Sequence, residues 1–157
     1  TVYSFAVDGY SGVTGNYALN LLLSSGAPAN DSFSTPATLL SDVRAAALNT
    51  LATAQAGELA HFPGTAASKS LWWRWTATST GFVSVTTAGS TFDTVLAVYT
   101  GTTLNALTTV AQNDEASGDD STSTVFFRAV AGQSNSQRLI VMHNRNNHII
   151  SLVRSIF

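Results

Sequence analysis

The clearest strand pattern in the sequence is Ser70-Leu71-Trp72-Trp73-Arg74-Trp75-Thr76-Ala77. Its apolar positions recur with a period of two, which is typical of a β-strand. The alternation puts Trp73 and Trp75 on one face and Trp72 on the other. Because aromatic side chains dominate core energetics, we expect Trp73 and Trp75 to be buried.

Further short strands are expected on the C-terminal side of this one. Thr80-Gly81 is turn chemistry, and the strand pattern resumes from Phe82 to Val85. Two more apolar runs, Val95 to Tyr99 and Val125 to Val130, also end at turn signals. Short strands at this spacing predict an all-β sandwich or barrel.

Residues 37–56 fit two interpretations. Leu39, Val43 and Ala47 have helical spacing, and alanine favours helices. The later part, from Leu48 to Thr53, could equally be a strand.

The two ends of the chain carry similar patterns. The tail predicts a hairpin with arms Arg138–Met142 and His148–Val153. The start resembles it, with alternating apolar residues in two runs: Tyr3, Phe5, Val7, Tyr17, Leu19 and Leu21. We therefore expect 1–26 to be the closing hairpin and linker of a preceding repeat, or a donor hairpin, and 27–157 to be one repeat.

Composition narrows the class of protein. Charged residues make up only 10% of the 157 residues, and the net charge is −2. A chain with no general basic field is not expected to bind nucleic acid. There is no cysteine, which excludes disulfides and thiolate metal sites. No apolar run is long enough to cross a bilayer.

A longer motif in the chain resembles that of a known protein family. It runs from Ser70 to Ala77, then from Gly89-Ser90-Thr91-Phe92-Asp93-Thr94 to Gly101, then from Val110 to Glu115. This motif, with Tyr3 to Tyr10, resembles the bacterial pre-peptidase C-terminal (PPC) domain family. The resemblance implies a jelly-roll-type antiparallel β-sandwich, a strand within 45–56, and a secreted or cell-surface location.

Oxygen ligands in the expected loops predict a structural calcium site. Calcium prefers carboxylates and carbonyls. Asp93 precedes a strand, and Asn113 and Asp114 follow another, while Glu58 lies before the tryptophan strand. Resemblance to calcium-binding family members supports Asp93 and Asp114 most. The competing interpretation is that both aspartates bond backbone amides in turns.

Trp72 and the histidines are the other residues that could form a site. Trp72, on the face opposite the core, is the candidate platform for stacking on a sugar. The spacing of His61, His143 and His148 does not indicate a metal site, and no nucleophile motif indicates a hydrolase.

We therefore expect a non-enzymatic structural or adhesive module of a bacterial surface protein. Its partners are expected to be neighbouring copies or repeats, joined into fibres through the N-terminal hairpin as in strand donation. The alternative is a module that binds polysaccharide or matrix protein for an attached secreted enzyme.

Overall fold

The structure is a computed structural model that describes residues 26–116 and 121–131, the backbone of 137–144 and 149–156, and a few isolated positions before residue 26. Its regular elements are β1 (Ala37–Thr38), β2 (Ala45–Leu48), β3 (Leu71–Thr76), β4 (Gly81–Thr86), β5 (Thr94–Thr100), the short 3-10 helix η2 (Leu104–Ala106), β6 (Thr108–Asn113), β7 (Thr124–Ala129), β8 (Gln137–Asn144) and β9 (Ile149–Ile156). The expected all-β class is confirmed.

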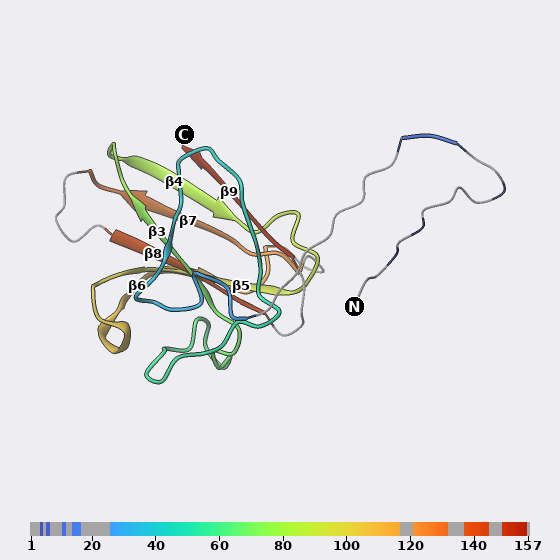
Figure 1. Ribbon diagram of the computed structural model, residues 1–157. Helices are drawn as coiled ribbons and strands as arrows, with labels where there is room; N and C mark the ends of the chain where they lie inside the picture. Colours follow the sequence, from blue (N-terminus) through green and yellow to red (C-terminus); the bar gives the residue numbers. More distant parts are fainter. Residues whose placement is uncertain are drawn as a thin grey trace.

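The strands form two sheets (Figure 1). One has the order β1-β3-β8-β5-β6, and the other has the order β2-β9-β4-β7. Apart from the parallel pair β1–β3, all strand pairs are antiparallel.

The pairing is nested. β5 pairs with β6, β4 with β7, β3 with β8 and β2 with β9, and successive pairs alternate between the two sheets. Each pair therefore encloses the previous one along the sequence, and the middle of the nest is β5 with β6.

Both sheets contribute to one core. From the first sheet come Leu71, Trp73 and Trp75 of β3 and Leu96 and Val98 of β5. From the second come Val83 and Val85 of β4 and Val125 and Phe127 of β7. Alternation thus buries one face of each strand, and the expected burial of Trp73 and Trp75 is confirmed, both being 3% exposed.

The first sheet is also covered on its outer face. Trp72, Ala97 and Tyr99 form a second buried cluster beneath the loop residues Phe33, Leu59, Leu104 and Leu107. In Figure 1 the teal-green loop between residues 55 and 70 lies below β5. This cover explains why β5 is buried at six consecutive positions, Thr94 to Tyr99.

Gly101 ends β5, as the Thr100-Gly101 turn signal predicts. Its φ is +130°, and an added Cβ would lie 3.2 Å from Leu107 Cδ2. A side chain here would be strained by the backbone conformation and would have to displace Leu107 slightly.

Two sequence expectations need correction. The tail does form two strands, but β8 pairs with β3 and β5, and β9 pairs with β2 and β4. They belong to different sheets, so the expected tail hairpin is wrong. The helix interpretation of 37–56 is wrong too, because the structure places β1 and β2 there. The strand implied within 45–56 is present as β2, but it ends at Leu48 and does not continue to Thr53.

Candidate functional site

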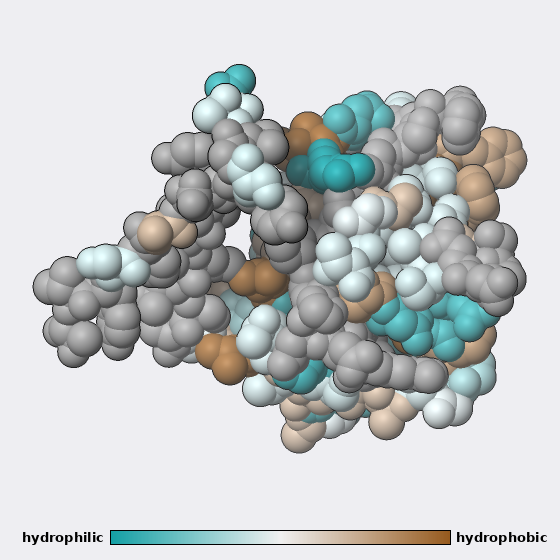
Figure 2. All heavy atoms as spheres, turned by 90° about the vertical axis from the view of Figure 1, so that its right-hand side faces the viewer, coloured by the Kyte–Doolittle hydropathy of each residue, from teal (hydrophilic) through white to brown (hydrophobic). Residues whose placement is uncertain are grey.

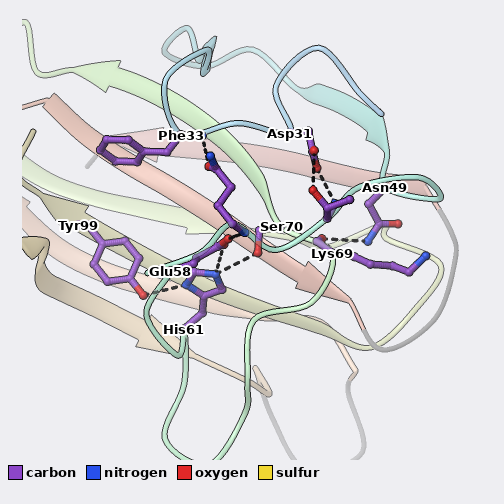
Figure 3. A network of polar contacts seen from close by, with 10 residues as sticks. Asp31, Phe33, Asn49, Glu58, His61, Lys69, Ser70 and Tyr99 are labelled. Atoms are coloured by element: carbon purple, nitrogen blue, oxygen red, sulfur yellow. Dashed lines mark hydrogen bonds and ion pairs between the residues drawn. The ribbon is translucent and has the colours of Figure 1, made fainter. Parts of the chain in front are cut away.

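The main polar cluster of the described residues centres on His61 (Figure 3). His61 Nδ1 lies 3.0 Å from the Tyr99 hydroxyl. His61 Nε2 lies 2.8 Å from Glu58 Oε1 and 3.1 Å from Ser70 Oγ. The Gln55 backbone N–H donates to Glu58 Oε2 at 2.7 Å. We call Gln55, Glu58, His61, Ser70 and Tyr99 the buried network.

Local structure brings these residues together. Tyr99 lies on β5, and Ser70 directly precedes β3. The segment between β2 and β3 turns at Gly57, whose φ is +86°, and the Glu58 N–H bonds the Gln55 carbonyl at 3.0 Å. That turn aims the carboxylate and imidazole at the outer face of the first sheet.

Gln55 extends the network to a third segment. Its Oε1 accepts the Phe33 N–H at 2.6 Å, and its Nε2 donates to Ser32 Oγ at 3.2 Å. The network therefore joins the loop around residue 33, the loop around residue 58 and strand β5 over Trp72.

Electrostatics fix the charge state of Glu58. Burial raises its pKa, but hydrogen bonds with His61, Ser70 and the Gln55 amide, together with the charge of His61, lower it more, so the net shift is downward from 4.5. The carboxylate is thus the form that the site favours.

Tyr99 responds in the opposite direction. Burial and then the nearby Glu58 charge raise its pKa to about 12. The phenol therefore remains a neutral hydrogen-bond partner of the imidazole.

The arrangement differs from a catalytic triad. A triad places serine on one imidazole nitrogen and the carboxylate on the other. Here Glu58 and Ser70 share Nε2. The side chains of His61 and Glu58 are each 1% exposed, and Ser70 and Tyr99 are fully buried. The network is suited to fastening loops over the sheet.

Sequence reasoning missed this network. Glu58 was expected near a calcium ion, and His61 was given no role. The Glu-x-x-His spacing is the available sequence signal, because it keeps the two side chains only three positions apart in the chain. Ser70 and Tyr99 join only through the fold.

Trp72 is not an exposed platform. It is fully buried, its ring centroid lies 5.1 Å from that of Phe33, and its Nε1 has no hydrogen-bond partner among the described residues. The expectation that Trp72 stacks on a sugar is therefore corrected. Alternation did put it on the opposite face, but loops cover that face.

The residues expected to bind calcium lie in two different places in the structure. Asp93 directly precedes β5, and β6 ends at Asn113, which is paired with Leu96, so Asp93, Asn113 and Asp114 lie toward the same end of these strands. Glu58 belongs to the buried network around Tyr99, toward the other end of β5.

The oxygen of Asn113 has another partner. Its Oδ1 accepts the Thr124 N–H at 2.8 Å, and its Nδ2 donates to the Glu115 carbonyl at 2.8 Å. Across the residues that the structure describes, no three His, Asp or Glu side chains are grouped to hold a metal. Calcium at Asp93 and Asp114 stays a prediction without Glu58.

The expected assembly residues Tyr3, Phe5, Val7, Tyr17, Leu19 and Leu21 lie outside the described residues. The same holds for the expected hairpin at 1–26, apart from its last residue and a few isolated positions.

The outer face of the second sheet carries two exposed aromatic side chains. Phe82 on β4 is 65% exposed, and Phe126 on the neighbouring strand β7 is 69% exposed. Ser84 pairs with Phe126 and Phe82 pairs with Arg128, so the two phenylalanines are diagonal neighbours on one face. β7 is the edge strand of this sheet. We call Phe82, Phe126 and Arg128 the aromatic edge.

Elsewhere the surface is mixed. On the side shown in Figure 2, strongly hydrophobic residues form small separate patches among pale and hydrophilic ones. Leu40 and Val43 are exposed as well, at 59% and 48%, in the segment between β1 and β2.

Comparisons with protein-family models, curated proteins and solved structures find no match. Among the described residues, no helix has the length and apolarity needed to span a membrane.

Proposed function

We propose that this chain is a non-enzymatic structural or adhesive module of a bacterial cell surface, and that it acts through contacts with neighbouring copies. The observation that carries the proposal is the contrast between its reactive and its exposed groups. The histidine, carboxylate and phenol of the buried network are sealed beneath loops. The aromatic edge is open on one sheet face.

The aromatic edge has the features of a protein contact. Single exposed apolar residues are ordinary on protein surfaces. Two adjacent phenylalanines beside a strand edge that no other described strand pairs with are more informative. Aromatic residues and arginine are enriched at interfaces, and strand edges invite pairing.

Sequence features support the surface location. A charged fraction of 10% suits a flat β-rich surface covered with Ser, Thr and Asn. The resemblance to PPC domains, which occur in secreted proteins, points the same way. The alternative was a module that binds polysaccharide or matrix protein for an attached secreted enzyme. Its polysaccharide part loses the support of Trp72, because Trp72 is buried.

The test is the particle size of the purified chain, by light scattering and negative-stain microscopy, with about 2 mM calcium and then with chelator. We expect concentration-dependent assemblies. Loss on chelation would connect assembly to Asp93 and Asp114.

A matched pair of variants makes the test specific. Phe82→Ser with Phe126→Ser should reduce assembly, because it removes both exposed rings. Leu40→Ser with Val43→Ser removes two exposed apolar residues elsewhere and should leave it unchanged. A chain that is monomeric at every concentration contradicts the proposal, and glycan binding by that monomer would favour the alternative.

A further inference from the structure

The direction of the backbone groups along β7 follows from Thr124, its first residue, and from Ser123 directly before it. The Thr87 N–H donates to the Ser123 carbonyl at 2.9 Å, so Ser123 faces β4. The next N–H, that of Thr124, donates to Asn113 Oδ1 at 2.8 Å, away from β4. Along an antiparallel strand these directions alternate. The backbone N–H and C=O groups of the odd-numbered residues of β7 therefore point toward β4. Those of the even-numbered residues point toward the edge of the sheet.

Phe126 and Arg128 are consequently the residues that present backbone N–H and C=O groups at this edge. Their side chains are exposed on the outer face of the sheet. Thr124 also faces the edge, but its N–H is already bound by Asn113. Main-chain groups and exposed side chains thus coincide at two positions.

We propose that this edge pairs with the same edge of a second copy, antiparallel, with Phe126 of each copy opposite Arg128 of the other. The inference rests on the proposed function as a self-associating module and names the surface that it uses. The contact is two-fold and isologous. It joins two four-stranded sheets into one continuous sheet.

The chemistry of the edge selects this register. Residues that face the edge must lie opposite one another to exchange both N–H···O bonds. Setting Phe126 opposite itself would place Thr124 opposite Arg128, and the Thr124 N–H is not available. The register with Phe126 opposite Arg128 uses only edge residues whose backbone groups have no partner among the described residues.

Side chains favour the same register. It sets each guanidinium beside a phenylalanine ring of the other copy, a cation–π arrangement. In this register the two Arg128 side chains do not lie directly opposite each other, an arrangement of like charges that would be destabilising. Within its own sheet Arg128 already faces Phe82, so the arginine would lie between two rings.

Two variants test the contact on the full chain, by sedimentation velocity over a concentration series. Phe126→Pro removes an N–H that faces away from β4, so it breaks no bond to β4. Arg128→Glu keeps the backbone and replaces the cation by an anion. We expect each to weaken dimerisation roughly tenfold or more. Arg74→Glu, an exposed arginine on β3, is the matched control and should have no effect.

Cross-linking tests the register. The chain has no cysteine, so Phe126→Cys and Arg128→Cys chains can be mixed and oxidised. Opposed residues lie about 5.5 Å apart by Cα, within disulfide range. Residues on the diagonal lie about 7–8 Å apart, beyond it. We expect the mixture to give a cross-linked dimer, and each variant alone to give little.

The outcomes separate this inference from the proposed function. If the wild-type chain assembles but Arg128→Glu and Phe126→Pro assemble equally well, the edge is not the contact and the module proposal stands. If dimers form and are lost in both variants, but larger assemblies never form, the edge pairing stands and the fibre fails. A wild-type monomer at all concentrations overturns both.

Discussion

Glu58 is the residue whose charge the fold uses most directly. Its carboxylate accepts hydrogen bonds from His61 and the Gln55 amide. Glu58→Gln keeps the shape but removes the charge, so the free energy of unfolding should fall by about 2 kcal/mol. Urea denaturation measures the loss. Glu115→Gln, an exposed carboxylate, is the control and should stay within about 0.5 kcal/mol.

The lowered pKa of Glu58 also predicts a pH dependence. A depressed folded-state pKa gives stability that is present above the unfolded value of 4.5 and is lost as pH falls through the folded value. The urea concentration at the midpoint of unfolding should therefore decrease as the pH falls below about 4.5. Glu58→Gln should show a shallower drop, and an equal drop in both chains would contradict this assignment.

The raised pKa of Tyr99 predicts a loss of stability at alkaline pH. Its folded pKa is raised from 10.0 to about 12, so its stability contribution is complete below pH 10.0 and is lost between there and about 12. Tyr99→Phe cannot ionise and should lose less stability over this interval. Thermal unfolding of both chains across the interval checks the result, with the neutral-pH difference subtracted.

Strand β3 is the element whose burial depends most on the covering loops. It buries Trp73 and Trp75 against the second sheet and Trp72 beneath Phe33 and Leu59. Trp72→Ala should therefore cost about 3–5 kcal/mol, as a core tryptophan does. Trp73→Ala is the comparison. A cost below about 1 kcal/mol for Trp72 alone would mean that the loops do not cover it tightly.

Strand existence was more predictable than strand partnership. The alternation around Trp73, the run of β5 and both tail strands were read from the sequence because a period of two is local. The tail hairpin was wrong because β8 and β9 each have better partners in different sheets. Local spacing carries no information on which distant strand completes a ladder.

At the scale of the whole molecule, the N-terminal segment is the remaining assembly candidate. Deleting residues 1–24 should leave a monomer or a simple dimer if that hairpin extends the assembly into fibres, because a two-fold edge contact closes on itself. Light scattering and negative-stain microscopy distinguish these states. Filaments that persist after the deletion would rule out the hairpin as the joining element.

The sequence by itself determined the all-β class, the positions of the strands that follow residue 70 and the burial of Trp73 and Trp75, because these depend on local periodicity and on turn residues such as Gly101. Only the tertiary structure decided the rest. It buried Trp72, separated Glu58 from Asp93, joined Glu58 to His61 and Tyr99, and put Phe126 at an open edge. Each of these depends on segments far apart in the sequence, which meet only when the two sheets form and the loops fold over one face.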